Sequence, residues 1–93
     1  MITSFRSKAL KRFAEKGDKS KLPLTQMAGK IARILSALNV AKHPLEMKMP
    51  GIDFHILTGP MKGRFSVWIT GNWRITFGWE GEDATEVDLE DYH

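Results

Sequence analysis

Cysteine is absent from all 93 residues of the sequence. Its absence excludes disulfide bonds, thiolate metal sites and a cysteine nucleophile. It also agrees with a protein of a reducing compartment, where disulfides are rare.

Long apolar runs are missing as well. The opening residues 1–6 contain no apolar stretch of the length that a signal peptide needs. Nowhere does the sequence approach the roughly 20 consecutive apolar residues of a membrane-spanning helix. We therefore expect a cytoplasmic protein that has no contact with the membrane.

Acidic residues are scarce over most of the chain. Residues 1–79 hold all 14 Lys and Arg against four acidic residues, a net charge of +10. Residues 80–93 hold the other seven of the 11 acidic residues, a net charge of −7. The basic body favours a polyanionic partner, because neutralising phosphates releases counterions. The alternative is that the two charged regions compensate each other within the fold.

What the sequence does contain is typical of one small folded domain. Apolar residues make up 42% of the chain and charged residues 27%, which argues against disorder. A chain of 93 residues is long enough for one domain and too short for two. We therefore expect a single domain over residues 1–93.

Two helices are predicted in the first half of the chain. The first covers residues 7–16, and Gly17 is suited to end it. The second follows Pro23, which suits a first helical turn. Lys30 and Arg33 are expected to point away from the core. The apolar stripe of this second helix consists of Met27, Ile31, Ile34, Leu35 and Leu38.

After residue 51 the apolar period changes from about 3.6 to 2, as in strands with one buried face. Residues 39–51 themselves are expected to form a loop with one helical turn at most. Four strands are predicted, over residues 53–57, 64–70, 73–79 and 86–90. Two helices followed by an antiparallel meander predict an α+β domain, with both helices packed on one face of the sheet.

The Gly71-Asn72 turn decides which side chains share a face. A two-residue loop would place Ile69 and Ile75 on opposite faces, so we expect a three-residue loop or a bulge near Gly71. Phe54 and Ile56 are expected on the core face. The face that points away from the helices then carries His55, Ser66, Trp68, Thr70, Arg74 and Thr76.

Several of these side chains suit the cleavage of RNA. Cleavage without a metal needs a base for the 2′-hydroxyl, an acid for the departing 5′-oxygen and a cation for the phosphorane. Histidine serves as base or acid, and arginine donates two hydrogen bonds at once to a phosphate. Taken singly, each candidate also has a structural interpretation, as a surface side chain or a frayed chain end. The candidates are His55, His93, Arg74, Tyr92, Asp91, Lys62 and Arg64.

Other kinds of site are less favoured. Trp68 suits base stacking, but also packing on a loop. Asp88, Glu90 and Asp91 give a weak metal signal, and a solvated strand face is the preferred interpretation. His43 is expected in a loop without partners. No Gly-rich phosphate loop, Ser-His-Asp order or HExxH motif is present, and no metal or other cofactor is expected.

Two motifs resemble those of a known family. The run Gly-Asn-Trp-Arg-Ile-Thr-Phe of residues 71–77 and the terminal Val-Asp-Leu-Glu-Asp-Tyr-His of residues 87–93 are similar to the HigB-type toxins of the RelE/ParE superfamily. The opening Ile-Thr-Ser-Phe of residues 2–5, followed by a Lys-rich helix, is similar too. The resemblance covers essentially the whole chain.

This resemblance implies an activity and its partners. Such toxins are ribosome-dependent endoribonucleases that cut mRNA in the ribosomal A site, and a helix-turn-helix antitoxin, here HigA-like, neutralises them. It also implies a RelE-like two-layer fold. The expected partners are therefore mRNA, the ribosome with its 16S rRNA, and the antitoxin. The catalytic residues that the resemblance implies are His55, Arg74, Asp91, Tyr92 and His93.

We accordingly expect acid–base cleavage to a 2′,3′-cyclic phosphate and a 5′-hydroxyl. His55 and His93 would carry protons, in an order that the sequence leaves open, and Arg74 would stabilise the phosphorane. Asp91 would orient a histidine or a nucleotide, and Tyr92 would position the scissile nucleotide. Further contacts to RNA are expected from Lys8, Lys11, Arg12, Lys30, Arg33, Lys62, Arg64 and Trp68.

One residue departs from the family's pattern. Where the family often has His-Pro-Leu-Lys-Gly, this chain has His-Ile-Leu-Thr-Gly over residues 55–59, with Thr58 at the lysine position. A phosphate contact is lost there unless Lys62 or Arg64 replaces it. Two rival functions stay open, a superfamily member that poisons DNA gyrase and a non-catalytic RNA-binding module.

Overall fold

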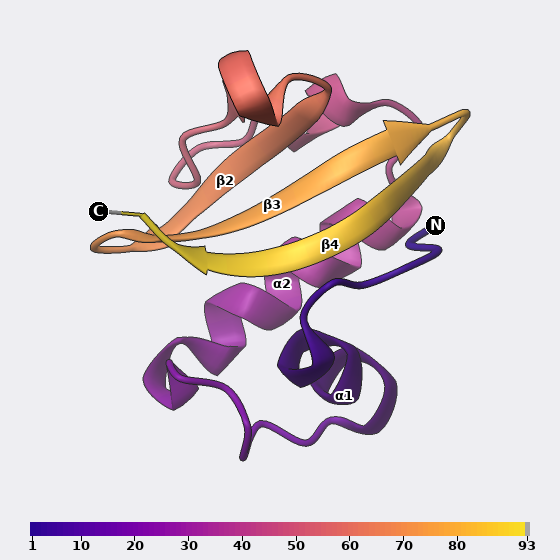
Figure 1. Ribbon diagram of the computed structural model, residues 1–93. Coiled ribbons are helices and arrows are strands. Elements are labelled where there is room, and N and C mark those ends of the chain that lie inside the picture. The colour runs from indigo at the N-terminus through magenta and orange to yellow at the C-terminus, as the bar shows by residue number, and fades with distance from the viewer. Residues whose placement is uncertain (93) are drawn as a thin grey trace.

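The computed structural model describes residues 1–92 of the chain. It contains two α-helices, α1 (Lys8–Lys16) and α2 (Ala28–Val40), and four strands, β1 (His55–Ile56), β2 (Arg64–Thr70), β3 (Trp73–Glu80) and β4 (Asp83–Asp91). The strands form one antiparallel sheet in the order β1-β2-β3-β4, and both helices lie on one side of it (Figure 1). The α+β prediction is confirmed to this extent. Three short 3₁₀ turns complete the fold: η1 (Thr25–Met27), η2 (Pro44–Met47) and η3 (Gly59–Met61).

Capping residues define both ends of α1. Ser7 caps the first turn, because its Oγ accepts a hydrogen bond from the Leu10 backbone N–H at 3.1 Å. Gly17 ends the helix in the left-handed region, with φ of 68°. Leu10 is the fully buried residue of this helix. Ala9 and Phe13 also pack against the core, while the basic residues of α1 stay exposed.

The second helix begins later than predicted. Pro23 lies in the preceding turn, and residues 25–27 form η1 before α2 starts at Ala28. The reason is that Leu22 and Leu24 are both buried, which anchors this segment in the core before the helix can start. The predicted stripe is otherwise confirmed, since α2 buries Ile31, Ile34, Leu35 and Leu38.

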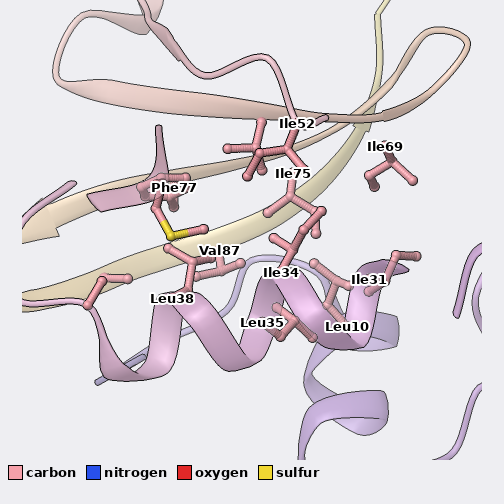
Figure 2. Packing of buried hydrophobic residues seen from close by; sticks show 14 of the residues in the cluster. Leu10, Ile31, Ile34, Leu35, Leu38, Ile52, Ile69, Ile75, Phe77 and Val87 are labelled. Atoms are coloured by element: carbon pink, nitrogen blue, oxygen red, sulfur yellow. The ribbon is translucent and has the colours of Figure 1, made fainter. Parts of the chain in front are cut away.

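The core lies between α2 and the inner face of the sheet. Figure 2 shows Ile34 and Leu38 of the helix directed toward Ile75, Phe77 and Val87 of the strands. Full burial of each such side chain stabilises the fold by about 1.5–3 kcal/mol. This packing fixes which face of each strand points inward, and with it the composition of the outer face.

The predicted bulge is present near Gly71. Trp68 pairs with Arg74, but Thr70 pairs with Trp73, so β2 carries one extra residue at Ile69. The register places Trp68 and Arg74 on the same face, as predicted. Thr70 departs from the prediction, because its partner Trp73 packs against the core.

A second irregularity shapes β4. Thr76 pairs with Asp88 but Gly78 pairs with Thr85, so two residues of β4 lie opposite one residue of β3. Glu86 in this bulge has a positive φ of 49°, and its backbone N–H donates to Ser4 Oγ at 2.8 Å. The N-terminal segment runs parallel to β4 with bridges at residues 2 and 5, which covers a sheet edge that would otherwise be open.

The first strand is shorter than predicted. β1 has two residues, and Ile56, expected on the core face, is 62% exposed. Phe54 does pack inward, stacked on Phe65 with 5.8 Å between ring centroids. The difference arises because β1 lies at the edge of the sheet. Within residues 1–92, no helix is long and apolar enough to span a membrane.

Candidate active site

The outer face of the sheet contains a cleft of about 620 Å³. All four strands contribute to it, through His55 and Ile56 of β1, Ser66 of β2, Arg74 of β3 and Glu90 of β4. The loop after β1 and the segment after β4 also line it. These segments supply Leu57, Thr58, Met61 and Tyr92.

Strand register brings the polar side chains together. His55 pairs with Ser66, and Arg74 pairs with Glu90. Paired residues share a face of the sheet. The predicted sharing of one face by His55, Ser66 and Arg74 is therefore confirmed, and the pattern extends to Glu90.

His55 is held by a neighbouring carboxylate. Its Nε2 lies 3.1 Å from Asp53 Oδ2, and more than half of each side chain is exposed. Asp53 has a φ of 42°, a left-handed conformation that few non-glycine residues adopt. The carboxylate of Asp53 thus orients an exposed imidazole, a side chain of the type that serves as acid or base in catalysis.

Arg74 and Tyr92 form the opposite wall. The guanidinium carbon lies 5.8 Å from the centroid of the Tyr92 ring, and the Tyr92 backbone N–H donates to Asn72 O at 2.7 Å. Burial raises the pKa of Tyr92, as does the charge of Glu90, while Arg74 opposes the rise. Tyr92 is thus a neutral phenol at physiological pH. Arg74 Nη1 is buried and has no hydrogen-bond partner within the described part of the chain.

Arg64 takes a different position from the one expected. It is 9% exposed, and its Nη2 donates to Thr76 Oγ1 at 3.0 Å and to Glu86 O at 2.8 Å. Thr76 in turn donates to a carboxylate oxygen of Glu90. Arg64 therefore supports the cleft from within the sheet, and a phosphate contact would require these bonds to break.

Glu90 is a cleft residue that sequence reasoning assigned to a solvated face. The signal was present, because Glu90 lies two residues before Tyr92, and residues two apart in an extended chain project to the same side. Asp91 instead pairs with Trp73, on the neighbouring pleat, and does not line the cleft. His93 lies outside the described residues. The structure thus brings together three of the predicted catalytic residues, His55, Arg74 and Tyr92.

Lys30 also differs from its expected position. Instead of pointing away from the core, its ammonium group donates to Ile69 O at 2.7 Å and to Gly51 O at 3.1 Å. It also lies 4.2 Å from the centroid of the Trp68 ring. Desolvation lowers the pKa of Lys30. Lys30 of α2 thus supplies a hydrogen bond to the carbonyl of Ile69 at the bulge and another to the carbonyl of Gly51 in the loop before β1.

The remaining predicted RNA-binding cations are exposed. Those on α1 and α2 lie on the helical side of the sheet, away from the cleft (Figure 1). Arg12 among them is paired, with its Nε 2.6 Å from Asp18 Oδ2. Hydrogen bonds from Ser20 and Arg12 hold the pKa of Asp18 well below its usual value. The exposed cations are Lys8, Lys11, Arg12, Arg33 and Lys62.

The cleft is poor in cations for a phosphate-binding site. Thr58 lines it at the position where lysine was expected. Among the described lining residues, Arg74 is the one with a permanent positive charge. Within residues 1–92, no group of three or more His, Asp or Glu side chains is placed to hold a metal ion.

Comparison with known proteins identifies the family of the chain. The family model described as the RelE-like toxin of type II toxin-antitoxin system HigB matches residues 3–93. The chain is also 38% identical to the protein named Endoribonuclease HigB from Proteus vulgaris, over 93 residues that cover all of both chains. These matches confirm the resemblance carried by the two motifs. The chain belongs to the HigB family of RelE-like toxins of type II toxin–antitoxin systems.

Proposed function

We propose that this toxin is an endoribonuclease that cuts mRNA in the ribosomal A site. The observation that carries the proposal is the cleft, where four strands gather an imidazole, a guanidinium, a phenol and a carboxylate. The name of the relative from Proteus vulgaris supports the same activity. Residues 1–93 would act as one domain, in the cytoplasm, where translating ribosomes are found.

The chemistry we propose is an internal transfer followed by release of the downstream fragment. The 2′-oxygen gives its proton to a base and attacks phosphorus, and the 5′-oxygen departs with a proton from an acid. His55 fills one of these roles, and His93 is proposed for the other. Arg74 would neutralise the charge on the phosphorane, as a preorganised donor does for other developing anions.

Tyr92 and the two neighbouring acids would have supporting roles. The neutral phenol of Tyr92, packed against Arg74, would position the scissile nucleotide by stacking or hydrogen bonding. Asp91 is proposed to orient a histidine or a nucleotide at the end of β4. Glu90, bonded to Thr76 and paired in register with Arg74, would help to hold the guanidinium in place.

The composition of the cleft supports dependence on the ribosome. With Thr58 in place of lysine and Arg74 as the cationic lining residue, the cleft has few groups to grip and bend a free RNA strand. Alignment supplied from outside can contribute about 7–11 kcal/mol to such a reaction. The exposed cations of α1 and α2, on the other side of the sheet, are suited to the phosphates of 16S rRNA.

The family implies an antitoxin partner, and we propose a helix-turn-helix protein of the HigA type. Overproduction of the toxin alone should then arrest bacterial growth, and a neighbouring antitoxin gene should relieve the arrest. Harmless overproduction of soluble toxin would contradict this assignment.

The experiment that tests the proposal compares cleavage of the same mRNA when it is free and when it is being translated. Purified toxin is added to naked mRNA and to the same mRNA during translation, and 5′ ends are mapped by primer extension. We expect cuts within A-site codons in the translated sample and largely intact naked mRNA. Equal cleavage in both samples would refute ribosome dependence. RNA binding without cleavage in either sample would favour a non-catalytic module, and inhibition of gyrase supercoiling would favour a gyrase poison.

A further inference from the structure

A second cleft adjoins the first and has no role in the proposed chemistry. It has a volume of about 560 Å³ and is lined by Met49, Gly51, Asp53, Trp68 and Arg74. Arg74 lines both clefts, so the two hollows share this side chain. Two hollows that share one phosphate-binding side chain match the repeat of an RNA strand, in which each phosphate lies between two nucleosides.

The second cleft is lined by the indole of Trp68, whose position is fixed by contacts within the protein. Its indole Nε1 donates to Gly71 O at 3.0 Å, and its backbone N–H donates to Ile52 O. Lys30 lies over the ring and is itself bound to two carbonyls. Trp68 lines the cleft, whereas Lys30 does not. A ring held in this way loses little conformational freedom when a base stacks on it.

Asp53 offers the same cleft a hydrogen-bond acceptor. Its Oδ2 is engaged with His55 of the first cleft, which leaves Oδ1 for a second partner. An ionised carboxylate only accepts hydrogen bonds. It therefore suits a base edge with adjacent donors, such as the N1–H and N2–H of guanine. Uracil presents a single N3–H between two carbonyl oxygens, and these would face the carboxylate unfavourably.

We propose that this second cleft binds the nucleotide next to the scissile phosphate, with its base stacked on Trp68 and its donor edge on Asp53. Arg74 then contacts the phosphate that joins the two nucleotides. The subsite favours guanine over uracil. The inference rests on the proposed function in one respect, since it requires an RNA strand to cross both clefts.

A binding experiment tests the subsite without any cleavage. The chain has three tryptophans, so an ¹H–¹⁵N spectrum shows three indole N–H signals, each assignable by substitution. The full-length toxin is titrated with the 2′-O-methyl trinucleotides GGG and UUU, which cannot be cut. We expect the Trp68 signal to move to saturation, with tighter binding of GGG. A Trp68 signal that does not move at millimolar trinucleotide, or that moves no more than the Trp79 signal, would overturn the proposal.

Trp79 supplies the matched control. Its Nε1 donates to Gly81 O at 2.9 Å, the same kind of turn contact that Trp68 makes, but Trp79 packs against the core. Trp68→Ala should weaken GGG binding about 5- to 150-fold, the range for one stacked base, and Trp68→Phe should keep most of it. Trp79→Phe should leave the affinity unchanged. Asp53→Asn should bring GGG and UUU closer together, and equal affinities in the wild type would refute base reading by Asp53.

The same variants on translating ribosomes separate this proposal from the proposed function. If wild type cuts mRNA, Asp53→Asn should weaken its preference for guanosine beside the cut, and an unchanged preference would overturn the proposed base reading. If wild type does not cut but the Trp68 signal shifts as expected, the endonuclease proposal fails and the subsite is supported.

Discussion

The two faces of the sheet come from the same strands and differ in almost every property. On the inner face, Ile75 and Phe77 are fully buried against α2. On the outer face, Arg74 and Glu90 line a cleft. Because side chains alternate along a strand, β3 contributes to stability on one side and to the candidate site on the other.

The comparison also shows that the outer face is no ordinary solvated surface. Ser66 and Thr76 lie on it, yet they are 1% and 0% exposed. Thr76 links buried Arg64 to Glu90, and unsatisfied polar groups at such depth would be costly. Substitutions on the inner face should therefore change stability and leave the reaction unaffected. Substitution of an exposed cleft residue such as His55 should change activity with little effect on stability.

The largest expected effect comes from removal of the last two residues. Val87 is fully buried and Leu89 packs against the core, so β4 is anchored before Tyr92. Deleting Tyr92 and His93 should abolish mRNA cleavage on ribosomes and lower the free energy of unfolding only by about 1 kcal/mol, for the lost hydrogen bond to Asn72. Wild-type cleavage by the truncated protein would refute the C-terminal assignment.

Arg74→Ala should give a smaller but still large loss of activity. Loss of a preorganised donor to a transition-state anion costs roughly 10²–10³ in rate. Arg33→Ala, an exposed cation on α2, serves as the control and should mainly weaken ribosome binding and flatten its salt dependence. The measurement is single-turnover cleavage at saturating toxin. Equal losses for the two variants would remove Arg74 from the chemistry.

A conservative substitution on the inner face should lower stability and leave activity unchanged. Ile34 of α2 is 1% exposed, and Ile→Val substitutions in cores cost about 0.5–1.5 kcal/mol. Ile34→Val should lower the urea midpoint accordingly while cleavage per folded molecule stays at the wild-type rate. A large loss of rate in this variant would show that the two faces are coupled.

The smallest effect is a change in the titration of Tyr92, the single tyrosine of the chain. Its pKa is raised by burial and by Glu90, so folding favours the neutral phenol. That contribution to stability is complete below the ordinary tyrosine pKa and is lost as pH rises through the raised value. Glu90→Gln should lower the pKa and Arg74→Ala should raise it, as tyrosinate absorbance would show. Identical titrations in all three proteins would contradict this arrangement of charges.

Much of the fold follows from local patterns in the sequence. Gly17 ends α1 because its φ is positive, and the stripe from Ile31 to Leu38 identifies α2. The bulge before Gly71 was predictable, since Ile69 and Ile75 had to share the buried face. The start of α2 was missed because burial of Leu22 and Leu24 depends on tertiary contacts that Pro23 does not reveal.

The candidate site was predictable to a lesser degree. Alternation along the strands places His55 and Arg74 on one face. It does not indicate how deeply a side chain is buried, so the burial of Arg64 was missed. In the sequence, Glu90 is indistinguishable from the other acidic residues of a charged strand. Its hydrogen bond with Thr76 is a feature of the tertiary structure. The pairing of Asp53 with His55 depends on the left-handed backbone of Asp53. No sequence pattern predicts that conformation.

The most direct test of the account is the activity of His55→Gln on translating ribosomes, measured together with its unfolding. Glutamine keeps hydrogen-bonding capacity but carries no proton in the reaction. The His55 side chain is more than half exposed, so the free energy of unfolding should stay close to wild type. Cleavage should fall by about 10²–10⁴, the usual contribution of one general acid or base. A stable His55→Gln protein that cuts mRNA at the wild-type rate would contradict the assignment of the outer cleft as the active site.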